Sequence, residues 1–191
     1  LGDAQSCFIA GYLHQNGKGV EQSNQRANQA YSSGCKLGHG AACVNLGVLY
    51  VQGVGVAVDL NAAAAYFSQG CEVGDRRGCM HYGVMLVRGV GVKKDLDMGV
   101  KLLGVSCQVG EVEACASLRS DAGPLLKEAC EKGEHTHCYD AARFALDKQS
   151  ALELATLGCN GGFKISCVKL GFLEIDTSPA QSIKRFKSAC D

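Results

Sequence analysis

Cysteine pairs separated by eight positions are the feature that most constrains the fold of this chain. The sequence has 191 residues and 12 cysteines, and ten of the cysteines fall into pairs of the form C-x7-C. The pairs are Cys35/Cys43, Cys71/Cys79, Cys107/Cys115, Cys130/Cys138 and Cys159/Cys167. The distance from one pair to the next varies, whereas the spacing within each pair is constant. Because a disulfide fixes the geometry of its own loop only, this pattern predicts a disulfide within each pair.

Zinc binding is the alternative interpretation of these cysteines. Structural zinc sites usually gather about four ligands at spacings of roughly two to four residues, and the sequence has no C-x2-C motif. One pair encloses histidines, so that Cys130, His135, His137 and Cys138 can be drawn as a C/H/H/C set. His137 and Cys138 are adjacent and cannot easily reach one ion together. A surface turn is therefore the favoured interpretation, and no metal site is predicted.

Disulfides within the pairs imply an oxidising compartment, because cytosolic thiols are kept reduced. Cys7 and Cys190 lack a partner at the eight-residue offset. The expectation is that this sequence is part of a longer chain and that both cysteines pair outside it. Free thiols, or a bridge to another chain, are the alternatives.

A 36-residue repeat runs through the first part of the chain. Four cysteines are evenly spaced, and so are a set of glycines and a G-x-G-V motif. The repeated positions are Cys7, Cys43, Cys79 and Cys115; Gly11, Gly47 and Gly83; and residues 17–20, 53–56 and 89–92. A period of this length indicates a solenoid, in which each unit buries its apolar face against its neighbours.

Each 36-residue unit is predicted to contain two helices. Residues 41–52 are an apolar run that suits a helix and stops at Gly53, because glycine tolerates the positive φ of a tight loop. Residues 60–71 are rich in alanine and suit the second helix. The expected N-caps of the second helices are Ser23, Asp59 and Asp95. Each disulfide then joins the end of one helix to the start of the next, which in the third unit is expected near Cys79.

The units become shorter after the first part of the chain. Regular units occupy about residues 1–115, and shortened units that keep the cysteine pair occupy about residues 116–191. Breaks between their helices are predicted at residues 121–124, 147–149 and 177–179. Because repeats need neighbours to bury their faces, we expect residues 1–191 to form a single all-α solenoid of αα-hairpins.

One motif brings the chain close to a known family. The residues Leu46-Gly47-x-x-Tyr50-x-x-Gly53-x-Gly55-Val56-x-x-Asp59 closely resemble the Sel1-like repeat, a relative of the tetratricopeptide repeat. With its C-x7-C pairs, the chain is similar to the cysteine-rich subgroup. That subgroup includes the Helicobacter cysteine-rich proteins and a mitochondrial cytochrome c oxidase assembly factor. The resemblance implies a superhelix with one disulfide at each corner, and a role in scaffolding and protein binding.

Two functions follow from this resemblance. The first is a non-catalytic scaffold for protein–protein interaction, as a subunit or assembly factor of a larger complex in the mitochondrial intermembrane space. The alternative is a secreted or periplasmic bacterial protein with penicillin-binding or weak β-lactamase activity. The sequence has no N-x-[ST] motif, which slightly disfavours a glycosylated secretory protein.

Signals for catalysis are weak. The sequence contains no P-loop, dinucleotide-binding, zinc-protease or nucleophile-elbow motif. One S-x-x-K occurs, from Ser33 to Lys36, without the S-D-N and K-T-G motifs of β-lactamases, and a chance match is the favoured interpretation. His14, His39 and His81 are candidates for noncovalent haem, although a lone histidine is usually structural. No catalytic residue and no cofactor are therefore predicted.

The charge distribution restricts the partners. The 19 Lys and Arg residues balance 19 Asp and Glu residues, so the chain lacks the basic excess that nucleic-acid binding needs. Residues 37–58 carry no charge, but Asn45, Gln52 and several glycines interrupt them, which favours core packing over a membrane span. The expected partners are other protein subunits, with no nucleic acid, no membrane span and no small-molecule ligand.

A second apolar stripe on the first helices predicts a partner groove. If Leu46 and Tyr50 face the core, Val48 lies on another side of the same helix. The predicted groove residues are Phe8, Tyr12, Val44, Val48, Val51, Met80, Val84, Val87, Tyr139 and Phe172. A helix that is apolar on nearly all sides needs cover, so either the superhelix buries both stripes or a partner covers one. Such a groove would hold an amphipathic helix or an extended segment of another protein.

Overall fold

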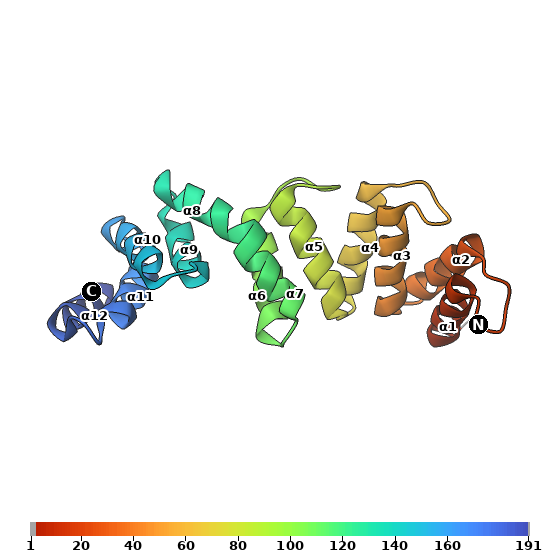
Figure 1. The fold of residues 1–191 in the computed structure, drawn as a ribbon, viewed down its shortest axis with the longest axis horizontal. Helices are drawn as coiled ribbons and strands as arrows, with labels where there is room; N and C mark the ends of the chain where they lie inside the picture. The colour runs from red at the N-terminus through yellow and green to blue at the C-terminus, as the bar shows by residue number, and fades with distance from the viewer. Residues whose placement is uncertain (1–2, 191) are drawn as a thin grey trace. The chain divides into compact units, whose positions relative to one another are not determined.

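The computed structural model describes residues 3–190, and in that part of the chain all regular structure is helical (Figure 1). Residues 1, 2 and 191, the ends of the predicted solenoid, lie outside the described residues. The first helices are α1 (Ala4–Asn16), α2 (Asn24–Lys36), α3 (Gly40–Gln52), α4 (Leu60–Glu72), α5 (Arg76–Arg88) and α6 (Leu96–Gln108). The later ones are α7 (Val112–Ser117), η1 (Leu118–Ala122), α8 (Gly123–Glu131), η2 (His135–His137), α9 (Cys138–Phe144), α10 (Lys148–Asn160), α11 (Lys164–Glu174) and α12 (Pro179–Cys190).

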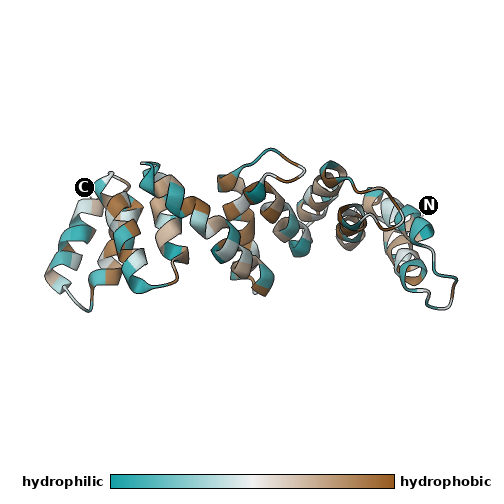
Figure 2. Cartoon of the chain, turned by 45° about the horizontal axis from the view of Figure 1, so that its top comes forward, coloured by the Kyte–Doolittle hydropathy of each residue, from teal (hydrophilic) through white to brown (hydrophobic). Residues whose placement is uncertain are grey.

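The chain divides into two compact units, Leu1–Cys115 and Ala116–Asp191. The division falls where the sequence loses its 36-residue period. A single solenoid over residues 1–191 stays a prediction. In the first unit α1/α2, α3/α4 and α5/α6 form antiparallel pairs (Figure 1). Figure 2 shows hydrophobic and hydrophilic residues interleaved along these helices.

The repeated glycines allow the two helices of each pair to pack closely. Gly47 in α3 lies against the ring of Phe67 in α4, and an added Cβ at Gly47 would be 2.7 Å from the Cε1 atom of that ring. Gly11 faces Tyr31 in the same way in the preceding pair. Each repeat therefore builds its core from a glycine on its first helix and a large side chain on its second.

The disulfides form as predicted, within all five C-x7-C pairs. They are Cys35–Cys43, Cys71–Cys79, Cys107–Cys115, Cys130–Cys138 and Cys159–Cys167. In the first unit each joins the penultimate residue of one helix to the fourth residue of the next, as Cys71 and Cys79 do. Cys159 and Cys167 join α10 to α11 at the same two positions.

The helix expected to begin near Cys79 does so, three residues ahead of that cysteine, at Arg76. Asp75 accepts a hydrogen bond from the backbone N–H of Arg77 and starts α5 at Arg76, ahead of Cys79. Likewise α11 begins at Lys164, so that Cys167 lies within the helix. The residues before the helix form its N-cap and set its first residue. The second cysteine lies further along the helix, where its side chain faces the partner cysteine.

The disulfides link successive helices at the corners as predicted, and half of the paired cysteines are also core residues. Cys167 is only 3% exposed, and Cys35, Cys43, Cys130 and Cys138 are exposed by 6%, 1%, 1% and 0%. The other five paired cysteines are half-buried. A bonded sulfur has no thiol proton to satisfy and packs as an apolar group. The disulfides therefore contribute to the core as well as linking successive helices.

The helix ends follow the local sequence. The predicted N-caps Ser23, Asp59 and Asp95 all accept a backbone hydrogen bond in the first turn of their helix. The second glycine of the later two G-x-G-V loops has a further function. Gly55 and Gly91 have φ of 73° and 68°, and a Cβ at either would meet the backbone of the preceding second helix, at Asn24 and Leu60. Only glycine combines this conformation with such a close approach.

The second unit departs from one expectation. The break predicted at residues 121–124 is not a loop, because η1 is a π-helical segment that runs directly into α8. The N–H of Gly123 donates to the carbonyl of Leu118, five residues earlier, and Pro124 fits the first turn of α8, where no intrahelical N–H bond is needed. The other two predicted breaks, before α10 and before α12, are confirmed.

Candidate functional site

The predicted groove residues fall into three classes of exposure. Val44, Met80 and Val87 are buried, with 2%, 5% and 0% of their surface exposed. The half-buried ones are Phe8, Val48, Val84 and Tyr139, and the exposed ones are Tyr12, Val51 and Phe172. The second stripe is thus partly covered by the repeats themselves and partly open.

The prediction is wrong for the three buried residues, and for Val44 and Val87 glycines on the second helices explain why. A Cβ at Gly70 in α4 would lie 3.0 Å from a methyl group of Val44, and one at Gly99 in α6 would lie 2.6 Å from a methyl group of Val87. Both valines therefore occupy space that a larger residue would fill. These side chains belong to the core and are not available to a partner protein.

A hollow on the first unit gathers the remaining stripe of α3 and α5. Val48 and Val51 of α3 and Val84 of α5 line a pocket of about 330 Å³. The other lining residues are Gln52, Leu60, Phe67, His81, Met85, Arg88 and Val90. We call this set of ten residues the α3–α5 groove. Its lining is mainly apolar, and its polar side chains are Gln52, His81 and Arg88.

Differences between successive repeats explain why this space is open and apolar. In the preceding repeat Tyr12 stands at the position of Val48, and Gln15 at that of Val51. The hydroxyl of Tyr31 donates to Oε1 of Gln15 at 2.7 Å, so the equivalent place carries a polar contact. At these positions of α3, Val48 and Val51 are smaller than Tyr12 and Gln15, so they leave the space open, and they present only methyl groups to it.

The comparisons with known proteins identify the repeat. The family model described as "Sel1 repeat" matches residues 4–39, 40–75 and 77–108. The chain belongs to the Sel1 repeat family. These three Sel1 repeats span most of the first unit and contain every residue of the α3–α5 groove.

Solved structures agree with this assignment. A Sel1 repeat protein from Oxalobacter formigenes is 21% identical, with a TM-score of 0.58, over 98% of this chain and 85% of that one. Protein c5321 of uropathogenic Escherichia coli, described as a protective antigen, is 20% identical, with a TM-score of 0.59, over 99% and 46%. Helicobacter pylori cysteine rich protein B is 30% identical, with a TM-score of 0.50, over 59% and 86%. The comparison with curated proteins gave no match.

His81 is the titratable residue inside the α3–α5 groove of the Sel1 repeats. Its ring stacks on Phe67, with 4.7 Å between ring centroids. Burial lowers the pKa of His81, Glu113 and Asp75 raise it, and Arg77 lowers it, with burial the largest effect. The imidazole is therefore neutral at pH 7 and contributes an apolar wall with a hydrogen-bonding edge.

Replacing His81 with asparagine, the residue 36 positions earlier, should reduce the acid sensitivity of the fold. Because burial lowers the pKa of His81, the unfolded chain takes up the proton first when the pH drops below about 6.5, and stability falls. The wild type should lose more free energy of unfolding than His81→Asn between about pH 7.5 and about pH 5. Urea titrations at both pH values measure this, and equal losses would contradict it.

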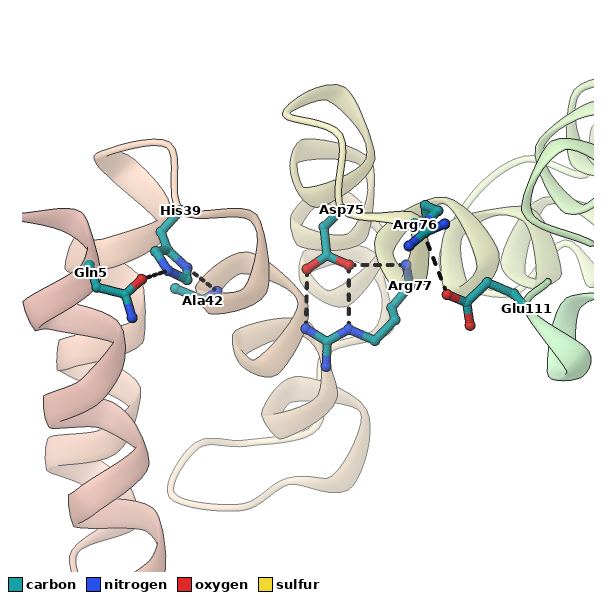
Figure 3. Close-up of polar contacts among 7 residues, drawn as sticks. All are labelled: Gln5, His39, Ala42, Asp75, Arg76, Arg77 and Glu111. Atoms are coloured by element: carbon teal, nitrogen blue, oxygen red, sulfur yellow. Dashed lines mark hydrogen bonds and ion pairs between the residues drawn. The ribbon is translucent and has the colours of Figure 1, made fainter. Parts of the chain in front are cut away.

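The other histidines predicted for haem serve local structure or lie apart. Nδ1 of His39 accepts the N–H of Ala42 and caps α3, and its Nε2 lies 2.7 Å from Oε1 of Gln5 (Figure 3). Since Nδ1 is the acceptor, Nε2 carries the proton and donates to Gln5. His14 lies half-buried in α1. His14, His39 and His81 lie on three different first helices or their caps and are not brought to one site.

The remaining sequence candidates lie outside the groove. Ser33 of the S-x-x-K match is exposed, and its hydroxyl donates to the carbonyl of Gln29 at 3.0 Å. Cys130 and Cys138, the alternative zinc ligands, are joined to each other in a disulfide. Over residues 3–190, no group of three or more His, Cys, Asp and Glu side chains is placed to hold a metal. No described helix has the length and apolar character needed to cross a bilayer.

Sequence reasoning missed much of the lining of the groove. Leu60 begins α4, Val90 lies in the loop after α5, and Arg88 ends α5. None of these belongs to the stripe on the first helices from which the groove was predicted. A sequence signal was present, since Leu60 and Val90 flank or lie in the repeated loop. Whether these residues line a groove, however, depends on how neighbouring repeats stack.

Proposed function

We propose that this protein is a non-catalytic scaffold whose α3–α5 groove binds a segment of a partner protein. The observation that carries the proposal is the open, apolar hollow lined by Val48, Val51 and Val84, which the chain's own second helices leave uncovered. The neighbouring stripe residues are buried against glycines on those helices. Apolar surface gathered in one concave place is characteristic of a binding site rather than of ordinary surface.

The side chains of the groove suit binding better than catalysis. Among the described residues that line it there is no Ser, Cys, Asp or Glu to act as nucleophile or carboxylate base. Its volume of about 330 Å³ is at the lower end of the usual range for ligand pockets, about 300–1,000 Å³. Such a hollow accepts a few anchoring side chains of a helix or extended segment.

The scaffold is proposed to act in an oxidising compartment, as a subunit or assembly factor of a larger complex. Its disulfides support this setting, since the reducing cytosol disfavours them. Both the mitochondrial intermembrane space and the bacterial periplasm or exterior are oxidising. The solved structures named above come from bacteria, which favours the periplasmic or secreted setting over the mitochondrial one.

Charge introduced into the groove should abolish partner binding without unfolding the chain. We expect Val48→Asp combined with Val84→Asp to remove the partner, because a buried carboxylate among apolar groups is costly. Val51→Asp should do the same with less risk to the fold, since 41% of Val51 is exposed. Gentle extraction from the native source, native size separation and mass spectrometry measure what co-migrates with each form.

Val105→Asp is the matched control, because Val105 is 57% exposed on α6 and does not line the groove. It should keep the partner, and all variants should keep the far-UV circular dichroism and melting temperature of a folded protein. If Val51→Asp is folded and retains every partner, the groove is not the binding site. If the wild type itself migrates alone, the scaffold proposal fails.

A further inference from the structure

The walls of the α3–α5 groove offer a partner no free charge. Residues 37–58, which include all of α3, contain no Lys, Arg, Asp or Glu. Among the described residues that line the groove, Arg88 is the one with a permanent charge, and it already interacts with another group of the chain. A segment that enters the groove therefore meets mainly apolar side chains and no charged side chain that lacks an interaction.

The loops that adjoin the groove are balanced in charge. Residues 52–60 lead from α3 into α4, and residues 88–97 lead from α5 into α6. The charged residues of these two segments are Arg88, Lys93 and Lys94 on one side and Asp59, Asp95 and Asp97 on the other. Asp59 and Asp95 cap their helices, and Asp97 also has an interaction within the chain. The surroundings thus have no excess of either sign that would select an acidic or a basic partner.

His81 is the residue of the lining whose charge changes between about pH 5 and pH 8. Its ring is stacked on Phe67, which belongs to the same lining. Burial has the largest effect and lowers the pKa of His81, whereas Glu113 of α7 raises it. Asp75 and Arg77 pair with each other at 3.1 Å (Figure 3), and their effects on the pKa of the imidazole oppose each other. His81 is therefore neutral at pH 7 and takes up a proton in acid.

The helices packed against α5 bring no further charge into the groove. These helices are α3, α4 and α6, and α3 is uncharged. Glu72 of α4 and Asp97 and Lys101 of α6 do not line the groove. Arg88 lies seven residues beyond His81, about two helical turns further along α5. A proton on His81 therefore adds a positive charge to a lining that is otherwise mainly apolar.

From this arrangement we infer that the groove binds an uncharged apolar segment of a partner protein, and that protonation of His81 releases the segment. The inference rests on the proposed function and names the partner chemistry and the regulation of the same site. Contacts with Val48, Val51 and Val84 supply affinity, because they remove methyl surface from water. A charged segment would bury its own charge without a counter-ion, which is costly.

The affinity should fall as the pH falls. A segment that covers the groove removes water from around His81, so binding disfavours the protonated form further. At pH 7.5 His81 is neutral with or without the segment, and the affinity does not depend on pH. Once the free protein takes up the proton, the segment binds only after that proton is lost, which weakens binding by up to about tenfold per pH unit.

Selection at pH 7.5 from a library of random 12-residue peptides displayed on phage tests the inference on the intact, oxidised protein. We expect the residues needed for binding, identified by alanine substitution, to be apolar and uncharged. An enriched peptide without His, Asp or Glu, synthesised and labelled, serves as the probe, because its own charge does not change in mild acid. Fluorescence anisotropy titrations should give a dissociation constant at least about threefold higher at pH 5.0 than at pH 7.5. Circular dichroism at both pH values shows whether the protein is folded.

Two substitutions at His81 test the cause of the pH dependence. His81→Asn removes the titrating group, so the ratio of the two dissociation constants should fall below about 1.5, whatever the affinity at pH 7.5. His81→Lys keeps a positive charge at both pH values and should weaken the probe at least about tenfold at pH 7.5. His39→Asn is the matched control, because His39 does not line the groove and asparagine can also cap α3. It should keep the ratio of the wild type.

The outcomes separate this inference from the proposed function. If Val51→Asp abolishes binding but the wild type and His81→Asn have the same ratio, release by His81 is wrong and the groove stands. The inference is also overturned if the peptides depend on a charged residue, or if the wild type loses the probe only at a pH where circular dichroism shows unfolding. If Val51→Asp leaves binding unchanged, or if no peptide is enriched, both the inference and the groove are overturned.

Discussion

Reduction of the disulfides is expected to unfold the protein. Each disulfide closes a loop of about nine residues, which the chain-entropy model values at roughly 2.5 kcal/mol. Five such links amount to at most about 13 kcal/mol, comparable to the whole stability of an ordinary domain, about 5–15 kcal/mol. Far-UV circular dichroism with a phosphine reductant should show loss of the helical signal at room temperature, with complete reduction verified by alkylation and mass spectrometry.

Removal of a single disulfide measures how much that disulfide contributes to the free energy of unfolding. Replacing Cys71 and Cys79 together with serine should lower the free energy of unfolding by roughly 2–4 kcal/mol. Cys190→Ser is the matched control, because Cys190 is exposed and forms no disulfide within residues 3–190. A fully reduced protein that keeps its helical signal and melting temperature would show that packing alone maintains the fold.

Gly47→Ala is expected to destabilise the core, although alanine normally favours a helix. The added Cβ would lie 2.7 Å from the ring of Phe67, closer than carbon atoms approach. The ring cannot easily withdraw, since Phe67 is only 3% exposed and His81 stacks on it. Overpacking of this kind costs about 1–3 kcal/mol, more than the helix propensity returns.

Gly104→Ala provides the matched control for this prediction. Gly104 lies within α6, and nothing is found within 4 Å of an added Cβ there. This variant should be stabilised by about 0.5–1 kcal/mol, the propensity difference between the two residues. Urea denaturation of the two variants should thus give opposite signs. Equal stabilisation of both would mean that the helices separate freely at Gly47.

A double variant tests the cause of the Gly47 effect. In the next repeat Gly83 faces Leu103, and an added Cβ at Gly83 would lie 3.0 Å from that side chain. Leucine is more adaptable than a rigid ring, so Phe67→Leu should recover part of the stability lost in Gly47→Ala. The recovery is measured as the coupling energy of the double-mutant cycle, and its absence would place the strain elsewhere.

The disulfides, caps and helix ends could be predicted because each depends on residues within one loop. Cys71 and Cys79 are eight positions apart whatever the rest of the chain does, and Asp59 caps the helix that directly follows it. The break predicted near Gly123 and Pro124 was wrong although it also rested on a local signal. Gly123 and Pro124 indicate a turn by composition, but the chain there forms a π-helical segment that continues into α8.

The repeat, the all-α fold and the position of each disulfide could be predicted, because they follow from spacing along the chain. Which apolar residues form the groove depends instead on how the helices pack against one another. Val44 and Val48 stand on the same helix with the same side chain, yet Val44 is buried against Gly70 and Val48 lines the hollow. The difference arises from the helices packed around α3, and the exposure of a side chain depends on those neighbours as much as on its own residue type.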